Sequence, residues 1–246
     1  MKIFEILKLS AEPFLPVLPA KVRSELKSIL KKSGNQTPVL LDAGGRKSSY
    51  TIGISARIVI CDKPRESETQ KKLGLGITPE IAHRIKKQRS NISEIIFHDL
   101  ALSPLTGKLF DGVVCVEVIE HVWDDEKFIK NIFNTIKPGG FLYLTTPNGD
   151  YVKNEPPNFN PDHKRHYKKI ELENLIKKYF TEADVYYGIK TGRYRFWGLR
   201  SFSLKKPFQL IWTMFANLIN RIESRGLDEQ ASRTAHLFCL AFKKKL

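Results

Sequence analysis

Short apolar runs alternate along this chain with stretches whose apolar residues recur at helical spacing. The runs are rich in Val and Ile and predict strands buried on both faces, whereas the spaced stretches predict helices with one apolar side. We expect strands at 38–42, 56–62, 94–100, 111–118, 141–146, 183–189 and 237–242, and helices at 21–32, 79–89, 124–136, 169–179 and 208–222. We expect Pro13, Pro16 and Pro19 to break the chain before the helix at 21–32, and the basic face formed by Arg84, Lys86, Lys87 and Arg89 to be solvated. This alternation predicts an α/β fold with a doubly wound, mostly parallel seven-stranded sheet and a helical insertion before the last strand.

Three segments of the chain differ in composition: a basic helical leader at 1–37, a main domain at 38–189 plus 236–246, and a basic and aromatic insertion at 190–235. We expect the leader helix to lie across the end of the main domain; an arm that contacts a membrane or a partner is the alternative. The insertion has no acid from Lys190 to Lys206, and its helix has one apolar face. We expect it to pack on the domain's own surface. A substrate lid, a dimer contact, an interfacial membrane helix and a site for single-stranded nucleic acid are the alternatives.

Charge and cysteine content bear on the surroundings of the protein. The 246 residues include 41 Lys and Arg against 26 Asp and Glu, a net charge of +15. This balance favours association with phosphates, nucleic acid or an anionic membrane surface, although lysines that are merely solvated explain the charge equally well. Cys61, Cys115 and Cys239 lie in apolar runs without CxxC spacing, which indicates buried free thiols. With neither a signal peptide nor an apolar run of about 18 residues in the sequence, we expect a cytoplasmic protein, with the membrane surface as the alternative place.

Polar residues follow directly on several predicted strands. The apolar strand within Phe110–Val122 ends in Glu117, Glu120 and His121. Other strands end in Asp42 with the Gly44–Gly45 turn, in Asp62 and in Asp99. In an open α/β sheet, ligands bind outside the carboxyl ends of the strands. Glycine lets the backbone approach a ligand, and a carboxylate about twenty residues after the first strand suits a ribose diol because it accepts two hydrogen bonds.

These segments together resemble the class I S-adenosylmethionine-dependent methyltransferases, in their type 11/12-like subgroup with a Glu-x-x-Glu-His motif. The resemblance covers residues 38–187 and the last strand, and it rests on Val39–Gly44, Asp62, Phe110–Val122, Ile136–Gly140 and Leu144–Asn148 in family order. It implies a Rossmann-like fold, a transferase activity and S-adenosylmethionine as the cofactor. It also implies that Asp42, Gly44 and Gly45 line the methionine end of the cofactor, that Asp62 binds the ribose, that Asp99 and Leu100 flank the adenine, and that Glu117 lies near the transferred methyl group.

The glycine loop departs from the family pattern. Arg46 and Ser48 stand where later glycines are usual, and residues 49–51 replace the start of the first helix. We expect Arg46 or Lys47 to hold the carboxylate of the cofactor instead. A loss of cofactor binding is the alternative.

The cluster at the end of the fourth strand resembles sites in two methyltransferase groups. In the ubiquinone-pathway O-methyltransferases these positions hold magnesium or another divalent ion, and in the small-RNA 3′-end 2′-O-methyltransferases a later Asp-His motif adds a histidine. This chain has Asp162-His163 after Thr146-Pro-Asn148. The resemblance thus suggests a metal site made by Glu117, Glu120, His121 and His163, whose mixed ligands suit Mn²⁺ better than Mg²⁺. A metal-free catalytic role for Glu120, His121 and His163, or a structural role, is the alternative.

The expected activity is O-methylation of a small-molecule, glycan or lipid-precursor acceptor. One alternative is a metal-dependent RNA 2′-O-methyltransferase, since the chain is basic, although nucleic acid is not the favoured partner. A non-catalytic binding protein on the same fold is the other alternative. The Asn/Asp-Pro-Pro-aromatic motif of enzymes that methylate DNA base amines is absent after the fourth strand, which reads Val116–Glu120. The sequence does not predict the oligomeric state.

Overall fold

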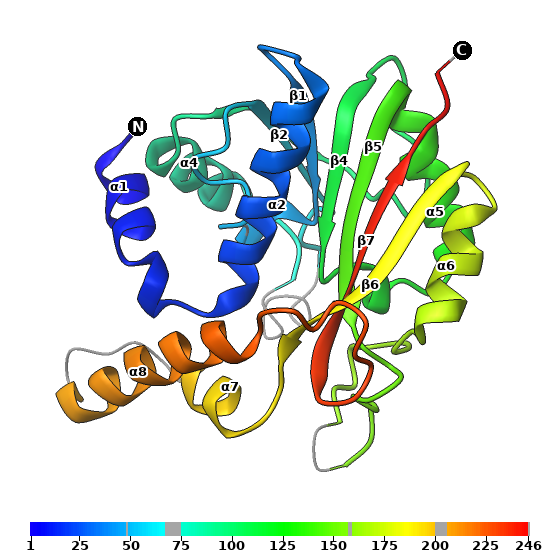
Figure 1. The fold of residues 1–246 in the computed structure, drawn as a ribbon. Helices are drawn as coiled ribbons and strands as arrows, with labels where there is room; N and C mark the ends of the chain where they lie inside the picture. The colour runs from blue at the N-terminus through cyan, green and yellow to red at the C-terminus, as the bar shows by residue number, and fades with distance from the viewer. Residues whose placement is uncertain (48, 67–74, 157–158, 200–205, 246) are drawn as a thin grey trace.

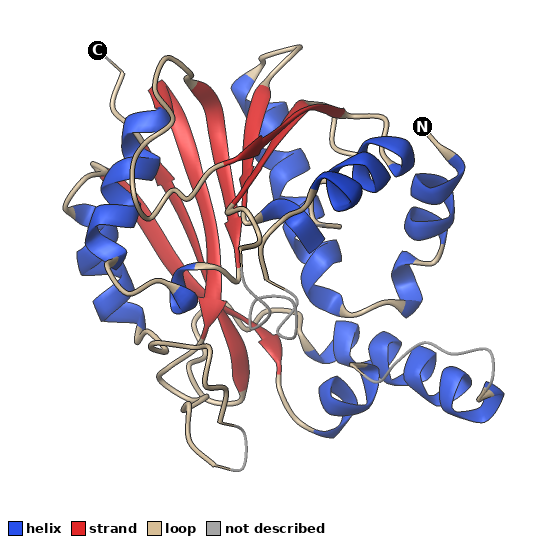
Figure 2. Ribbon diagram, turned by 180° about the vertical axis from the view of Figure 1, so that it is seen from behind, coloured by secondary structure: helices blue, strands red, loops and turns tan. Residues whose placement is uncertain are grey.

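Seven strands form a single sheet in the order β3-β2-β1-β4-β5-β7-β6 (Figures 1 and 2). The computed structural model describes residues 1–47, 49–66, 75–156, 159–199 and 206–245. The strands are β1 Val39–Ala43, β2 Arg57–Asp62, β3 Ile92–Phe97, β4 Phe110–Val116, β5 Ile136–Pro147, β6 Glu182–Lys190 and β7 Thr234–Phe242. Only β7 runs antiparallel to its neighbours within this described sheet. The predicted doubly wound, mostly parallel Rossmann-like sheet is confirmed.

Helices cover both faces of the sheet (Figure 1). The α-helices are α1 Ile3–Ser10, α2 Val17–Ser33, α4 Pro79–Gln88, α5 Asp125–Thr135, α6 Lys169–Lys177, α7 Arg193–Gly198 and α8 Pro207–Glu223, and the 3-10 turns are η1 Glu12–Phe14, η2 Gly45–Lys47 and η3 Ile119–His121. α5 and α6 bury apolar residues in one core, and α2 and α4 do so in the core on the other face. Burial of these side chains supplies the main stabilisation, at about 1.5–3 kcal/mol for each large one. Among the described helices, none has the length and hydropathy needed to cross a membrane.

The leader helix starts earlier than the sequence predicts. Pro19 was expected to interrupt the chain, but α2 begins at Val17 and contains Pro19 in its first turn. Proline is tolerated there because the first backbone N–H groups of a helix lack partners in any case. Val22 and Leu26 are fully buried against the sheet, so α2 is part of the core and not only a cover across its end.

Several other boundaries differ from the expected ones. The third strand ends at Phe97, so Asp99 lies in the turn that follows it. The fifth strand begins at Ile136, five residues before the predicted start. The short helices α1 and α7 were not predicted, because neither carries a long periodic pattern. Ser48 and the insertion residues Arg200, Phe202 and Lys205, which entered the predictions, lie outside the described residues.

Candidate functional site

The carboxyl ends of β1, β2 and β4 bring the predicted cofactor residues to one edge of the sheet. Asp42 lies opposite Ile60 in β2 and Val114 in β4, so Asp62 and Glu117 follow at the same end of neighbouring strands. Gly44 is exposed and has φ of 71°. A Cβ at Gly44 would come within 2.5 Å of the Val118 side chain. Glycine at this position therefore allows the β1 turn to pass close to the end of β4 and leaves its backbone open to a ligand.

A buried polar network holds Asp42. The Thr51 hydroxyl donates a hydrogen bond of 2.7 Å to Asp42 Oδ2, and Arg89 Nη2 donates one of 2.7 Å to the Thr51 hydroxyl oxygen. Asn91 Nδ2 donates to the Thr51 carbonyl. The prediction that Arg89 belongs to a solvated basic face is wrong, because the residue is only 4% exposed. Segment 49–51, which replaces the start of the usual first helix, thus positions Asp42 through the hydroxyl of Thr51.

Asp62 and Arg46 meet at the end of β2. The Arg46 backbone N–H donates a 3.3 Å hydrogen bond to Asp62 Oδ2. Burial raises the pKa of Asp62, while this hydrogen bond and the Arg46 charge oppose the rise. The described connection from β1 to β2 contains only the short η2 turn and no α-helix, as the sequence indicated. A carboxylate in this position keeps a second oxygen for a diol.

Asp99 and Leu100 lie in the turn after β3. Asp99 Oδ1 accepts a hydrogen bond of 2.9 Å from the Ala101 backbone N–H, which fixes the turn. The Leu100 side chain is buried in the core beneath α5, and Asn131 donates to its carbonyl oxygen. The Leu100 side chain therefore faces the core, and adenine contacts by Asp99 and Leu100 stay a prediction.

The hydrogen-bond partners of Glu117 are not the residues of the predicted metal cluster. Its carboxylate oxygen Oε1 accepts hydrogen bonds from the Thr145 hydroxyl at 2.8 Å and from His236 Nδ1 at 3.0 Å. Although burial raises the pKa of Glu117, the His236 imidazole and the Thr145 hydroxyl lower it more, so the pKa lies below its usual value. Glu117 also has φ of 55°, a left-handed conformation that non-glycine residues adopt chiefly at functional sites. Arg195 of α7 adds positive potential at this carboxylate.

Glu120 has the opposite electrostatic surroundings. Its side chain is 1% exposed and Oε2 accepts a 3.1 Å hydrogen bond from the Thr146 hydroxyl. Burial and the neighbouring Glu117 charge raise its pKa well above the usual value. Glu120 therefore keeps its proton to higher pH than an ordinary carboxyl does, and a cation bound beside it would oppose this shift.

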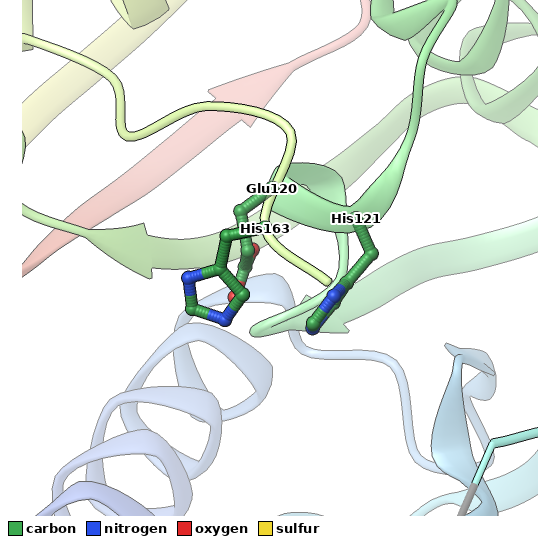
Figure 3. A group of neighbouring side chains, drawn as sticks. All are labelled: Glu120, His121 and His163. Atoms are coloured by element: carbon green, nitrogen blue, oxygen red, sulfur yellow. The ribbon is translucent and has the colours of Figure 1, made fainter. Parts of the chain in front are cut away.

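Hydrogen bonds orient two histidines beside Glu120 (Figure 3). His121 Nδ1 lies 3.0 Å from Asp162 Oδ2 and 3.2 Å from the Asp162 carbonyl oxygen. Both oxygens are acceptors, so Nδ1 carries a hydrogen, and Nε2 is the ring nitrogen left for a ligand or a proton. The loop that contains Asp162 is fastened to the η3 turn, because the Lys164 backbone N–H donates to the Glu120 carbonyl at 2.6 Å.

A relay of two rings orients His163 in the same way. His166 Nδ1 donates to the Val152 carbonyl, so its neutral ring accepts at Nε2 from His163 Nδ1 at 2.7 Å. The lone pair of His163 is then on Nε2. Burial together with the neighbouring His121 and His166 lowers the pKa of His163 to about 4, so this ring is neutral at pH 7. His166 thus joins the Val152 carbonyl to the His163 ring through its two nitrogens.

Three of the four predicted metal ligands lie together. One ligand atom from each of Glu120, His121 and His163 falls within 4.8 Å of the others, and Figure 3 shows the Glu120 and His163 side chains next to each other with the His121 ring beside them. Glu117 does not belong to this group among the described residues, since its carboxylate faces Thr145 and His236. One carboxylate and two imidazoles, each with its second nitrogen hydrogen-bonded, fit a divalent transition ion. A metal at this site stays a prediction.

Comparison with known proteins identifies the family. The model of a methyltransferase domain matches residues 18–184, which is more than half of the chain. The chain belongs to the methyltransferase family. Its expected place among the class I S-adenosylmethionine-dependent methyltransferases is confirmed, as is its Rossmann-like fold.

Individual relatives match the methyltransferase over shorter segments. A probable S-adenosylmethionine-dependent methyltransferase of Mycolicibacterium smegmatis is 33% identical over 95 residues, 38% of this chain and 37% of the relative. The human mitochondrial ubiquinone biosynthesis O-methyltransferase is 30% identical over 106 residues, 43% of this chain and 27% of the relative. The chain thus spans well under half the length of these relatives.

Among solved structures, phosphoethanolamine N-methyltransferase 2 of Haemonchus contortus in complex with S-adenosyl-L-methionine has a TM-score of 0.56 at 17% identity. The match covers 90% of this chain and 53% of that chain. The names of the relatives support S-adenosylmethionine as the cofactor of this methyltransferase.

Sequence reasoning missed five residues of this methyltransferase site: Thr51, Arg89, Thr145, Arg195 and His236. His236 lies 119 positions after Glu117, in an apolar run that gives no sign of a functional role. The residue is 3% exposed, and its Nε2 is buried and has no hydrogen-bond partner among the described residues. A lone histidine at the start of a buried strand was the available signal.

Proposed function

We propose that this methyltransferase transfers a methyl group from S-adenosylmethionine to a hydroxyl oxygen of a small-molecule, glycan or lipid-precursor acceptor. The observation that supports it best is the pair of imidazoles, each oriented by hydrogen bonds, beside Glu120. Attack by a hydroxyl on a methyl group requires a place for its proton, and two oriented ring nitrogens provide one.

The residues at the carboxyl ends of β1, β2 and β4 suit an adenosine sulfonium compound. Asp62 would hold the ribose diol, and Asp42 and the exposed Gly44 backbone would line the methionine end, with Arg46 beside them. When bound, S-adenosylmethionine supplies an electrophilic methyl group. The ionised Glu117 would lie near the positive sulfur, where a carboxylate is favoured by charge.

The acceptor half of the mechanism rests on His121 and His163. Either Nε2 takes the hydroxyl proton of the acceptor while the Asp162 carboxylate or the His166 ring steadies the imidazole from its other side. Glu120, His121 and His163 would alternatively hold a divalent ion, which would supply a positive charge that lowers the pKa of a nearby hydroxyl. The human ubiquinone biosynthesis O-methyltransferase among the relatives supports an oxygen acceptor.

Labelled-methyl transfer tests the proposal. The native protein is incubated with S-adenosylmethionine and a catechol, a glycoside or a phenolic lipid, with EDTA and with added Mn²⁺. Transfer in EDTA that is lost in His163→Ala supports the imidazole base, and transfer that needs Mn²⁺ supports the metal. His83→Ala is the matched control, because His83 is exposed on α4. Methylation of amines but not hydroxyls would overturn the proposal.

A metal-dependent RNA 2′-O-methyltransferase is the second candidate. The same cluster and the net charge of +15 support it. Labelled-methyl transfer to a short single-stranded RNA and to its 2′-deoxy counterpart, with and without Mn²⁺, distinguishes it from small-molecule methylation. The non-catalytic alternative would be favoured if neither the small molecules nor the RNA were methylated and calorimetry showed no binding of S-adenosylhomocysteine below about 1 mM.

A further inference from the structure

Helix α8 presents its apolar side to solvent and its polar side to the protein. Phe208, Ile211, Trp212, Phe215 and Ile222 are between 51% and 81% exposed, whereas Thr213, Asn217 and Asn220 are at most 2% exposed. An amphipathic helix of a water-soluble domain has the reverse arrangement. Figure 1 shows α8 extending with α7 from one side of the molecule, away from the sheet.

The buried polar residues fix this orientation. Asn217 Nδ2 donates to the Phe14 carbonyl at 2.9 Å and to the Gly198 carbonyl at 3.1 Å. Asn220 Nδ2 donates to the Lys190 carbonyl at 2.7 Å. Rotation of the helix to bury its apolar face would leave these amides and carbonyls unpaired, which is unfavourable. The outward apolar face is therefore a property of the packed state.

The apolar face continues onto α7. Phe196 and Leu199 are 65% and 55% exposed. The Trp197 and Trp212 rings of the two helices pack edge to face with centroids 6.4 Å apart. Aromatic and aliphatic side chains together form a larger exposed surface than scattered apolar residues do, and such a surface marks an interaction site.

The charge of the same segment identifies the partner. The chain has no Asp or Glu from Lys190 to Ile222. Among the described cations of this stretch, Arg193 at the start of α7 and Lys206 just before α8 are exposed, and they precede the exposed Phe196 and Phe208 in the chain. We propose that α7 and α8 dock this protein on an anionic lipid bilayer surface, with the apolar face in the interface and the cations at the headgroups.

The chemistry argues against other occupants. Two copies joined through this face would bring their acid-free basic segments together, which charge repulsion opposes. Single-stranded nucleic acid stacks on aromatic rings, but Ile211, Ile222 and Leu199 offer no ring to a base. Interfacial helices combine Trp, Phe and Leu on one side with Lys and Arg beside them, as α7 and α8 do. The proposal does not depend on which acceptor is methylated.

Vesicle flotation tests this docking. The native protein is mixed with vesicles of phosphatidylcholine alone or with phosphatidylglycerol added, and Ile211→Ser/Phe215→Ser is compared with Leu102→Ser/Leu109→Ser. Leu102 and Leu109 are equally apolar and are 68% and 52% exposed, but they lie between β3 and β4. We expect binding to the anionic vesicles, a loss of about tenfold or more in partitioning for the α8 variant because two large side chains no longer enter the lipid, and native binding for the control.

Four outcomes would overturn the proposal. The first is no binding to anionic vesicles. The second is binding that the α8 variant retains and that high salt abolishes, which would indicate adsorption by charge alone. In the third, light scattering shows a dimer of the native protein that the α8 variant lacks, so that the face joins two copies. In the fourth, a single-stranded RNA binds the native protein and the α8 variant loses that binding. Retained far-UV circular dichroism and an unchanged Tm of the variant show that it is folded.

Discussion

Two glutamates three residues apart, Glu117 and Glu120, lie in regions of opposite electrostatic character. Glu117 accepts hydrogen bonds from Thr145 and His236 and faces the positive potential of Arg195, and these lower its pKa against the effect of burial. Glu120 is buried beside the Glu117 charge and accepts only one side-chain hydrogen bond among the described residues, from Thr146, so its pKa is raised. The comparison teaches that burial raises the pKa of both carboxylates, and that the donors and charges around them decide which one ionises more readily.

This difference divides the site into two halves. In the proposed mechanism, the ionised Glu117 belongs to the cofactor side, and Glu120, with its raised pKa, belongs to the acceptor side together with His121 and His163. Substitutions should separate the two halves by what they change: cofactor affinity on one side, turnover on the other.

The largest effect is expected on the acceptor side. His163→Ala should lower kcat by about 10²–10⁴-fold, the usual contribution of a positioned general base, while the Kd for S-adenosylhomocysteine stays at the native value. Steady-state kinetics and calorimetry on the same preparation measure both. An equal loss of affinity for S-adenosylhomocysteine would contradict the assignment of His163 to the acceptor side alone.

The next effect belongs to the cofactor side. Glu117→Ala should weaken S-adenosylmethionine binding by roughly 10–100-fold, because a charged interaction of about 1.5–3 kcal/mol with the sulfonium is lost. The product S-adenosylhomocysteine, whose sulfur carries no charge, should lose less affinity. Calorimetric titration of both compounds tests this, and equal losses for the two would show that the charge of Glu117 does not act on the sulfur.

His236→Phe should destabilise the protein by about 1–3 kcal/mol, because the Glu117 carboxylate then keeps one donor fewer in a partly buried place. For a chain of this size the Tm falls by about 2–4 °C for each kcal/mol. His83→Phe on the exposed surface of α4 is the control and should leave Tm unchanged. A native Tm for His236→Phe would mean that Thr145 and Arg195 alone stabilise the charge of Glu117.

Glu120→Gln should have the smallest effect and the opposite sign. The unfolded Glu120 ionises near pH 4.5, whereas the folded one keeps its proton to higher pH, so the folded state binds more protons above pH 4.5 and loses stability as pH rises. Gln cannot ionise and removes this loss. We expect a Tm about 2–4 °C higher than native at pH 8 in EDTA and no difference at pH 4. A lower Tm at pH 8 would contradict the assigned protonation of Glu120.

Much of the fold followed from local sequence pattern. The apolar runs around Val39, Ile58 and Val113 predicted buried parallel strands, because such strands need no polar face. Pro19 led to a wrong predicted start for α2, because a helix tolerates proline in its first turn and the sequence does not show where that turn begins. Arg89 was misassigned because its partner, Thr51, lies 38 residues away in a segment without regular structure.

The site, like the fold, has features that local sequence predicts and features that depend on distant contacts. Asp42, Gly44, Asp62 and Glu117 were predictable because the ends of parallel strands meet at one edge of the sheet. His163 was found through its motif, but the relay through His166 that sets its tautomer was not, because a hydrogen bond between rings depends on the fold of the 148–166 loop.

The sequence by itself determined the order of strands and helices, the glycine turn and the acidic strand ends, since each is encoded in residues close together along the chain. Only the tertiary structure decided the charges of Glu117 and Glu120, the pairing of Glu117 with His236, and the outward face of α8. Those properties depend on what surrounds a side chain in space. The Coulomb and desolvation energies that set them act between residues as far apart as 117 and 236 in the chain.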